Sequence, residues 1–400
     1  MKRIAVITKY YNSWNFGGLL QAYALVQYLC NTGYDAFQIS YNEKVKSTIK
    51  TTSDVSQSFH NICFSAKCKR IKTKLFKKSR SIITKLFLEK KMAVRREASR
   101  EFRNSIPHTD TVYDLDSVRE SNILADCFIT GSDRVWSERT IGDPYYLSFA
   151  EGKAKISFAA SLRANDLTGS QKEAMKETLS GFKAISVREK DTIDILSPLS
   201  PVEVDWVLDP TFLLSAKEWS EISEMDPGHI SDAYILCYFL GDDRNNRKLA
   251  KQFAKKKNLK IVTLPYSKGE FCSADIGFGD YRCYQVSPPK FISLIKNAQY
   301  IMTDSFHASV FSSVFHKQFI AFSREELKNS GTRIESLLGL MGISDHFCGE
   351  CEKQTLDYIT ALPEIDYQYV DANIGEMKEH TYAFLKKALD SYFCEQDDSQ

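Results

Sequence analysis

The stretch Gln299–Phe322, QYIMTDSFHASVFSSVFHKQFIAF, holds two apolar runs separated by a segment with helical spacing. The runs Gln299–Thr303 and Phe319–Phe322 predict buried strands, and residues 307–315 predict the helix that joins them. Two parallel strands need a connection of this kind, because a tight turn can join only antiparallel strands. The stretch therefore predicts an α/β fold built on a parallel sheet.

The same alternation of apolar runs and helical periodicity continues along most of the chain. In the second half we expect further strands at Tyr234–Leu240 and Ile261–Pro265 and helices at 244–257 and 289–298. In the first half we expect strands at Ile4–Ile7, 36–41, Ile123–Thr130, Ile156–Ala160 and Ala184–Val187, with helices at Leu19–Leu29 and 170–180. Since the chain has 400 residues and 43% of them are hydrophobic, each half can form its own core. The sequence predicts two Rossmann-like domains with a cleft between them.

These expectations divide the chain into three parts. Residues 1–201 form the first Rossmann-like domain, which carries a basic helical insert at 60–105. Residues 202–374 form the second Rossmann-like domain. Residues 375–400 form a final helix, about Gly375 to Phe393, which packs across the joint between the domains, and an acidic tail.

Positive charge is concentrated in one segment of an otherwise balanced chain. The chain has 53 Lys and Arg against 51 Asp and Glu, but residues 67–103 alone have fifteen Lys and Arg against three Glu. Ile71, Leu75, Ile82 and Leu86 recur there at helical spacing, which is typical of a basic amphipathic helix that docks on an anionic membrane surface. A solvated helix face is the alternative. The segment has few aromatic residues for base stacking, so nucleic acid is not expected as a partner.

Targeting and metal signals are weak. No stretch reaches the roughly 18 apolar residues that a membrane span needs, and the start MKRIAVITKYYN lacks an apolar signal core. The cysteine pair Cys348-Gly-Glu-Cys351 has no second pair nearby to complete a zinc site. We therefore expect a cytoplasmic protein, peripheral at the inner face of the membrane, with no bound metal.

Polar residues that follow predicted strands of the first half are candidate ligand contacts, because open α/β sheets bind ligands at the carboxyl ends of their strands. Asn15, Gly17 and Gly18 follow the first strand, where glycine lets backbone amides approach an anion or a sugar. A tight turn is the alternative there. After the strand that ends at Thr130 come Ser132, Asp133, Arg134 and Trp136, which suit a sugar through hydrogen bonds, charge and stacking; a helix cap is the alternative.

Two further strand ends carry charged or titratable side chains. Arg188 ends a strand, where a buried arginine needs an anion, which could be a ligand or simply Glu189 or Asp191. Asp304, Ser305 and His307 follow the strand Gln299–Thr303, and His307 opens the next helix. A histidine at a helix start combines a group that titrates near neutrality with amides that favour anions, although a purely structural histidine is the alternative.

Taken in order, these motifs, with Ala159-Ala160-Ser161 and Val207-Leu-Asp-Pro-Thr211 between them, resemble the polysaccharide pyruvyltransferase family over most of residues 1–340. The resemblance implies an architecture like that of GT-B glycosyltransferases. It also implies transfer of a pyruvyl group from phosphoenolpyruvate to two hydroxyls of one sugar, which releases phosphate and makes a cyclic ketal. No cofactor is implied, and the saccharide acceptor could be lipid-linked.

The resemblance also suggests roles for single residues. Arg188 matches the arginine of the family's S-V-R-[DE] motif, which contacts the donor, and His307 matches the histidine of its R-x-H motif, the proposed acid. The chain departs from that motif at Ser305, so Arg333 is our candidate for the missing donor arginine and Arg324 the second choice. Asp304 is expected to orient His307.

The first-domain residues Asn15, Gly17, Gly18, Ser132, Asp133 and Arg134 are expected to hold the acceptor. A nucleotide-sugar glycosyltransferase with the same fold, and a nucleic-acid-binding protein that uses residues 67–103, are the alternatives.

Overall fold

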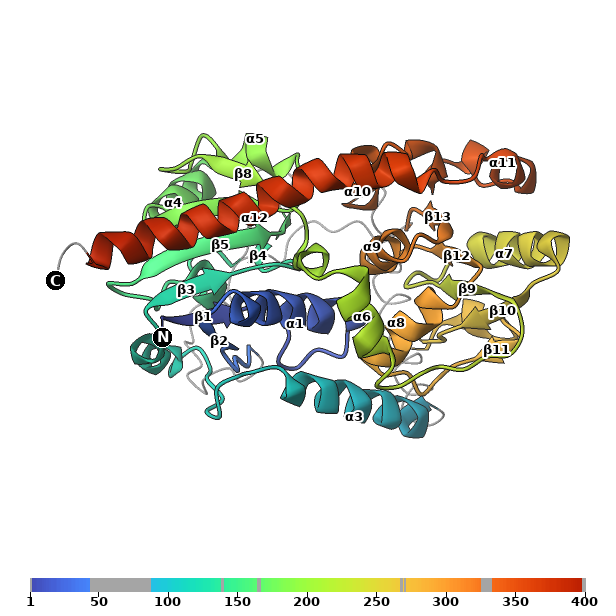
Figure 1. The fold of residues 1–400 in the computed structure, drawn as a ribbon, viewed down its shortest axis with the longest axis horizontal. Coiled ribbons are helices and arrows are strands. Elements are labelled where there is room, and N and C mark those ends of the chain that lie inside the picture. The colour runs from blue at the N-terminus through green and yellow to red at the C-terminus, as the bar shows by residue number, and fades with distance from the viewer. Residues whose placement is uncertain are drawn as a thin grey trace, which may run out of the picture.

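The structure is a computed structural model that describes residues 2–43, 88–137, 140–163, 167–266, 269, 271–324 and 333–397. Within them, two sheets of six parallel strands lie side by side, each covered by helices (Figure 1). The strands are short, apolar and mostly buried, as expected for parallel sheets covered on both faces. This is the predicted pair of Rossmann-like domains.

The first sheet reverses its strand order at β1. Its order is β2 (Asp35–Gln38), β1 (Arg3–Ile7), β3 (Cys127–Thr130), β5 (Ala154–Ala160), β7 (Phe182–Val187) and β8 (Val204–Trp206). The chain runs outward on one side of β1 and then resumes at β3 on the other side. The gap between the carboxyl ends of β1 and β3 is therefore a topological switch point, where such sheets bind ligands.

The second sheet has the Rossmann strand order. Its order is β11 (Tyr281–Arg282), β10 (Lys260–Thr263), β9 (Tyr234–Tyr238), β12 (Tyr300–Thr303), β13 (Gln318–Phe322) and β14 (Phe347–Cys348). The predicted unit around His307 is confirmed, since β12 and β13 pair in parallel and are joined by α9 (Phe306–Val314). The switch point of this sheet lies between β9 and β12.

The remaining described elements surround these sheets. They are α1 (Phe16–Asn31), α3 (Glu89–Ser105), α4 (Gly169–Leu179), α5 (Thr192–Leu196), α6 (Ala216–Ser223), α7 (Arg244–Lys257), α8 (Pro288–Lys296), α10 (Arg333–Met341), α11 (Leu356–Ala361), α12 (Tyr367–Asp397) and the short pair β4 (Trp136–Ser137) and β6 (Leu162–Arg163).

Two predicted boundaries are wrong. Strand β8 pairs with β7 in the first sheet, so the division between 201 and 202 falls one strand too early. The strand expected from Ile123 begins only at Cys127, because residues 118–124 form a 3₁₀ helix in which Ile123 is largely exposed.

Apolar side chains join the two domains directly. Phe16 at the start of α1 stacks on Phe291 of α8, with ring centroids 4.9 Å apart. Tyr23 of α1 lies 6.0 Å, centroid to centroid, from Trp219 of α6, which in turn meets Phe311 of α9 edge to face at 5.0 Å. These rings belong to or pack against one buried cluster that extends into both domains, so the arrangement of the domains is fixed by packing.

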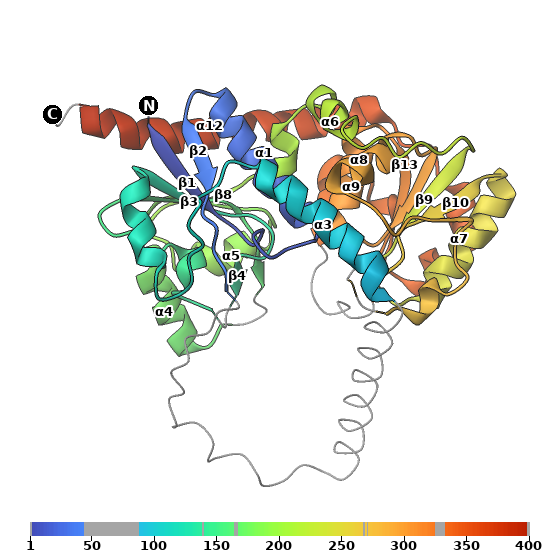
Figure 2. The same ribbon diagram turned by 90° about the horizontal axis from the view of Figure 1, so that it is seen from below.

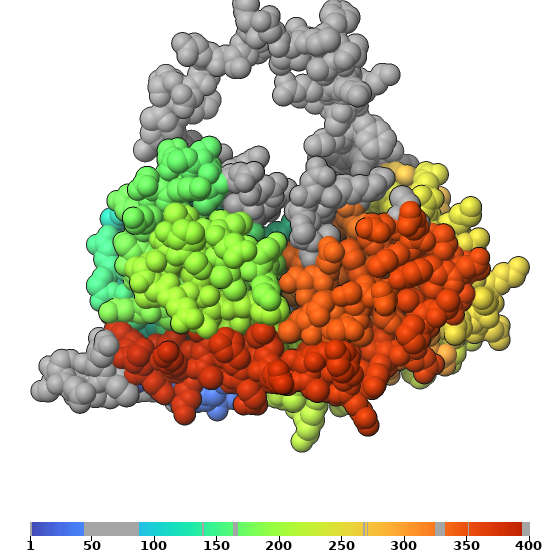
Figure 3. Space-filling model, turned by 90° about the horizontal axis from the view of Figure 1, so that it is seen from above, coloured from blue at the N-terminus to red at the C-terminus, as the bar shows by residue number. Residues whose placement is uncertain are grey.

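Helix α12 crosses from one domain to the other along a single face of the molecule (Figures 1 and 3). Thr381 accepts a hydrogen bond from the backbone amide of Leu208, and Tyr382 stacks on Tyr28 of α1. Nearer its start, the hydroxyl of Tyr367 donates to the backbone carbonyl of Lys317 in the second domain. The helix therefore contacts both domains, over a longer range than the one we expected.

Helix α3 crosses the joint on the opposite side from α12 (Figures 1 and 2). Its Met92 and Phe102 are buried against the protein. Arg95 is 1% exposed and donates to backbone carbonyls of the second domain, those of Pro265, Tyr266, Cys283 and Tyr284. The apolar face of this part of the basic segment is thus buried inside the molecule, whereas residues 67–87 lie outside the described residues.

Candidate functional site

The switch points of the two sheets face each other across a cleft of about 410 Å³. The first domain contributes the loop after β1 and the loop after β3, and the second domain contributes the first turn of α9. The described residues that line the cleft are Lys9, Tyr10, Tyr11, Asn12, Ser13, Trp14, Asn15, Tyr41, Glu43, Asp133, Arg134, Tyr145, Leu240, Ser305, Phe306, His307, Arg324 and Arg333. Of the predicted site residues, Asn15, Asp133, Arg134, Ser305, His307 and Arg333 are therefore brought together.

The lining combines positive charge with aromatic rings. Lys9, Arg134, Arg324 and Arg333 are cationic, whereas Glu43 and Asp133 are the acidic residues among the described lining. Glu43 lies 3.7 Å from the Lys9 ammonium. An excess of cations suits a multiply charged anion, and the rings of Tyr10, Tyr11, Trp14, Tyr41 and Tyr145 offer apolar surface beside it.

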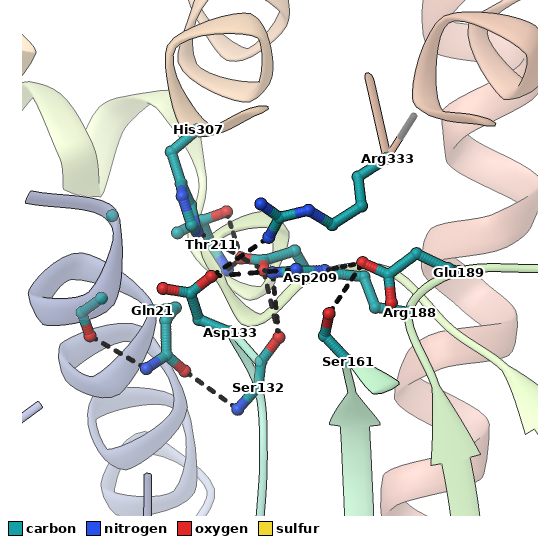
Figure 4. Close-up of polar contacts among 12 residues, drawn as sticks. Gln21, Ser132, Asp133, Ser161, Arg188, Glu189, Asp209, Thr211, His307 and Arg333 are labelled. Atoms are coloured by element: carbon teal, nitrogen blue, oxygen red, sulfur yellow. Dashed lines mark hydrogen bonds and ion pairs between the residues drawn. The ribbon is translucent and has the colours of Figure 1, made fainter. Parts of the chain in front are cut away.

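His307 lies at the base of the cleft, where the two domains meet. It is the second residue of α9, and Ser305 caps that helix by accepting a hydrogen bond from the amide of Ala308. The His307 side chain is 7% exposed, and its Nε2 lies 3.6 Å from Oδ2 of Asp209 in the first domain. Figure 4 shows the ring directed at a group of charged side chains from the first domain.

Gly17 makes room for this ring. A Cβ atom at position 17 would lie 2.0 Å from Nδ1 of His307, so only glycine lets the first turn of α1 approach so closely. At Gly18 a Cβ atom would meet nothing closer than 3.4 Å. Neither glycine lines the cleft among the described residues. The expectation that both present amides to the acceptor stays a prediction, whereas the structure gives Gly17 a steric role beside His307.

Arg188 lies beneath the cleft and does not line it within the described chain. Its side chain is 2% exposed, and its guanidinium pairs with Asp209 at 2.7 Å and Glu189 at 2.9 Å and lies 3.8 Å from Asp133. Its charge also lies 4.4 Å from the centre of the Phe306 ring. The assignment of Arg188 to the donor is corrected here: its anions are carboxylates of the protein, as in the alternative that the sequence left open.

The pKa values of two carboxylates of this cluster, Asp209 and Asp133, are lowered. Burial alone would raise the pKa of Asp209, but His307 and Arg188 beside it hold that pKa well below its ordinary value. The pKa of Asp133 is lowered against the effect of burial by His307, Arg188 and Arg333. Glu189, Asp209 and Asp133 likewise raise the pKa of Arg188 although burial opposes this. Asp133, Asp209 and Arg188 are therefore charged at neutral pH.

Arg333 and Arg324 supply guanidinium groups to the cleft, as the chain's departure from the R-x-H pattern suggested. Arg333 begins α10 and lies 3.3 Å from Oδ1 of Asp133. Burial and the nearby Arg188 lower its pKa to about 10, so it remains charged at neutral pH. Arg324 follows β13, on the opposite domain from Asn15 and Arg134.

Asp304 does not orient His307. Its two carboxylate oxygens accept hydrogen bonds from the backbone amides of Leu240 and Gly241, at 2.6 Å and 2.8 Å. These amides follow β9, so Asp304 ties together the ends of β9 and β12 at the switch point. Burial raises the pKa of Asp304, whereas Arg324 and these two amides lower it in part. The carboxylate near the ring is that of Asp209.

The structure also corrects part of the prediction for the loop after β3. Asp133 and Arg134 reach the cleft with backbone φ angles of 37° and 61°, a left-handed conformation that is uncommon outside glycine and concentrates at functional sites. Ser132 is fully buried and donates to Asp209, so it does not line the cleft. Trp136 is also fully buried, stacked on Tyr146, and cannot stack on a sugar.

Sequence reasoning missed Asp209 and the loop Lys9–Trp14. Asp209 was visible in the motif Val207-Leu-Asp-Pro-Thr211, but nothing in the sequence shows that it meets His307. Among the described residues, no three His, Cys, Asp or Glu side chains are placed so that they could hold a metal ion, and none of the helices has the length and apolar character that a membrane span needs.

Two facing Rossmann-like domains with a charged cleft at their switch points define the GT-B architecture. The chain belongs to the polysaccharide pyruvyl transferase family, whose profile matches residues 15–326, and it is a transferase. No curated protein sequence matches the chain.

Solved structures resemble the chain in fold alone. UDP-GlcNAc 2-epimerase from Neisseria meningitidis bound to UDP-GlcNAc is 12% identical, with a TM-score of 0.51 over 97% of this chain and 100% of that one. S. aureus MnaA in a co-structure with UDP is also 12% identical, with a TM-score of 0.49 over 98% and 97% of the two chains.

Proposed function

We propose that this enzyme transfers the pyruvyl group of phosphoenolpyruvate to two hydroxyls of one sugar in a cell-surface polysaccharide precursor. The observation that carries the proposal is His307, which opens α9 at the base of a cleft lined by Lys9, Arg134, Arg324 and Arg333. A donor with a phosphate and a carboxylate needs several cations, and an enol needs an acid. Membership of the pyruvyl transferase family supports the same reaction class.

The reaction needs one proton donor at the carbon of the enol. His307 donates a proton to C3 of phosphoenolpyruvate, which leaves positive charge at C2, and a sugar hydroxyl attacks C2 and loses its proton. The C2–O bond to phosphate then breaks, and a second hydroxyl of the same sugar attacks C2 and closes the ring. One hydroxyl proton replaces the proton that His307 gave, and the other leaves with the phosphate. No cofactor is required by this balance.

The cleft offers separate places for donor and acceptor. Arg324 and Arg333 of the second domain line the cleft together with His307 and would hold the phosphate and carboxylate of the donor, with Ser305 at the start of α9. Asn15, Asp133 and Arg134 of the first domain, with the aromatic rings of the loop after β1, would hold the sugar. The first domain is thus the acceptor domain and the second the donor domain.

The test is incubation with phosphoenolpyruvate and a panel of lipid-linked and nucleotide-linked saccharides, following phosphate release and the mass of the saccharide. We expect equal amounts of phosphate and of a saccharide heavier by one pyruvyl ketal. His307→Gln should leave donor binding nearly intact and lower turnover by ~100-fold or more, the usual scale for a lost acid. Transfer of a sugar from a nucleotide donor in the same panel would instead establish the glycosyltransferase alternative.

The location of the enzyme is a further part of the proposal. The basic residues 67–87, among them Lys72, Lys74, Lys77 and Lys78, would bind the anionic inner face of a membrane and bring the cytoplasmic enzyme to a lipid-linked acceptor. Salt-dependent co-sedimentation with anionic vesicles tests this. A variant with these four lysines changed to glutamate should lose that binding and keep its activity on a short, water-soluble acceptor.

A further inference from the structure

We propose that Asp209 is a positioning residue for this reaction, which holds the His307 ring in place and keeps it charged across the domain boundary. The inference rests on the proposed function, in which His307 is the acid. Asp209 follows β8 of the first domain, and His307 lies on α9 of the second. The pair of His307 and Asp209 therefore forms only where the two domains meet.

The Asp209 carboxylate cannot turn away from the ring. The side chain is 0% exposed. Its Oδ1 accepts the amide and the hydroxyl of Thr211, at 3.0 Å and 2.7 Å, and its Oδ2 accepts Arg188 at 2.7 Å. The Nε2 atom of His307 is buried without a hydrogen-bond partner in the described chain, 3.6 Å from that same Oδ2. A shift of a few tenths of an ångström makes this contact a hydrogen bond.

The charges of the salt-bridged cluster beside the ring balance only when the ring is protonated. The buried cluster contains the carboxylates of Asp133, Glu189 and Asp209 and the guanidinium groups of Arg188 and Arg333 (Figure 4). Three negative charges against two positive ones leave one uncompensated charge in a cluster that is mostly buried beneath the cleft. A charged His307 removes this imbalance, and buried charges are costly unless they are compensated.

Apart from the Asp133 carboxylate, the features beside the ring oppose its positive charge. His307 is in the first turn of α9, and the first turn of α1 packs against its other edge at Gly17, so two helix N-termini carry positive potential there. Lys9, Arg134 and Arg324 also line the cleft. Because Asp209 is the carboxylate that contacts the ring, loss of its charge should leave His307 neutral.

The first test replaces Asp209 with asparagine, which has nearly the same shape and no charge. We expect kcat to fall by ~100- to 10,000-fold, as when the carboxylate that orients a catalytic histidine is lost, with the KM for phosphoenolpyruvate nearly unchanged. Asp275→Asn is the matched control, since Asp275 is also a buried partner of an arginine, Arg247, at 2.6 Å and does not line the cleft. Asp275→Asn should leave kcat close to that of the wild type.

The second test measures the protonation state of the His307 ring in the absence of substrate. In a ¹⁵N-labelled protein the signals of His307 are those that disappear in His307→Gln. A charged ring gives two similar nitrogen shifts, whereas a neutral ring gives two well-separated shifts. At pH 7 we expect the charged pattern in the wild type and the neutral pattern in Asp209→Asn. Thr211→Val, which removes one hydrogen bond to Asp209, should lower kcat by about 10-fold and serves if Asp209→Asn does not fold.

The outcomes separate the two proposals. A neutral ring in the wild type, or a kcat that changes no more in Asp209→Asn and Thr211→Val than in Asp275→Asn, overturns the role of Asp209. A charged ring in the wild type that becomes neutral in Asp209→Asn supports it even if phosphoenolpyruvate proves not to be the donor. In that case the proposed function fails, but the conclusion that Asp209 keeps His307 charged stands.

Discussion

Replacing Gly17 with alanine displaces His307 without removing any functional group. The added methyl carbon would lie 2.0 Å from Nδ1 of the ring and 2.4 Å and 2.5 Å from two further ring atoms. Since such contacts do not fall below 3.0 Å in real structures, the ring has to retreat by about 1 Å. A misplacement of about 1 Å costs on the order of 100-fold in rate when the displaced group takes part in the reaction.

Gly18→Ala is the matched control, because it places the same methyl group one residue later on α1 with nothing closer than 3.4 Å. Either change removes glycine from a helix, which by itself favours folding by roughly 0.5–1 kcal/mol. The assay is phosphate release from phosphoenolpyruvate in the presence of the acceptor, together with urea unfolding of both variants. We expect kcat to fall roughly 100-fold in Gly17→Ala alone. Equal turnover in two folded variants would refute the reasoning that the position of the His307 ring limits catalysis.

Three further predictions follow from the charges of the site. Arg188→Ala should lower the free energy of unfolding by about 3–5 kcal/mol in urea titrations, because it leaves buried carboxylates unpaired; an unchanged stability with a raised donor KM would restore its role as a donor ligand. Arg333→Gln should weaken phosphoenolpyruvate binding by ~10- to 100-fold in calorimetry, the scale of one charged hydrogen bond, whereas unchanged binding would assign that role to Arg324. The pKa of Asp209 is lower in the folded protein than its ordinary value of 3.8. Asp209 therefore contributes to stability above pH 3.8, and this contribution is lost as the pH falls below that value. Urea unfolding between pH 6 and about 3 should show a loss of stability in the wild type and a smaller loss in Asp209→Asn.

Long apolar runs made most of the fold predictable. Ile4–Ile7 of β1, all of β9 and Ile301–Thr303 of β12 are buried, so their apolar composition alone predicts these strands. Strands β8, β11 and β14 have three, two and two residues, too few for any periodicity to appear. The domain boundary was misplaced for this reason, since β8 is the edge of the first sheet.

The site was predictable only where local sequence decides it. The start of α9 brought His307 and Ser305 to the cleft as expected, because a strand end and a helix cap are local features. Asp304 and Asp209 could not be told apart, since both are aspartates near strand ends and only the docking of the two domains decides which one meets the ring. Arg188 was correctly expected to need an anion, but which anion it pairs with depends on residues far away in the chain.

Helical periodicity predicts that a face is apolar without showing what covers it. Residues 67–103 were interpreted as a membrane surface, yet in the described part Met92, Arg95 and Phe102 pack within the protein. Arg95 is bound by four backbone carbonyls of the second domain, which no spacing rule identifies.

The transfer itself is tested most directly by running it in deuterium oxide with phosphoenolpyruvate and a saccharide acceptor. If His307 protonates C3, the ketal formed has a methyl group that carries one deuterium, and each ketal is matched by one released phosphate. NMR of the product and a phosphate assay measure both quantities in the same sample. A product without deuterium at the methyl carbon, or phosphate released with no ketal on the saccharide, would contradict pyruvyl transfer by this mechanism.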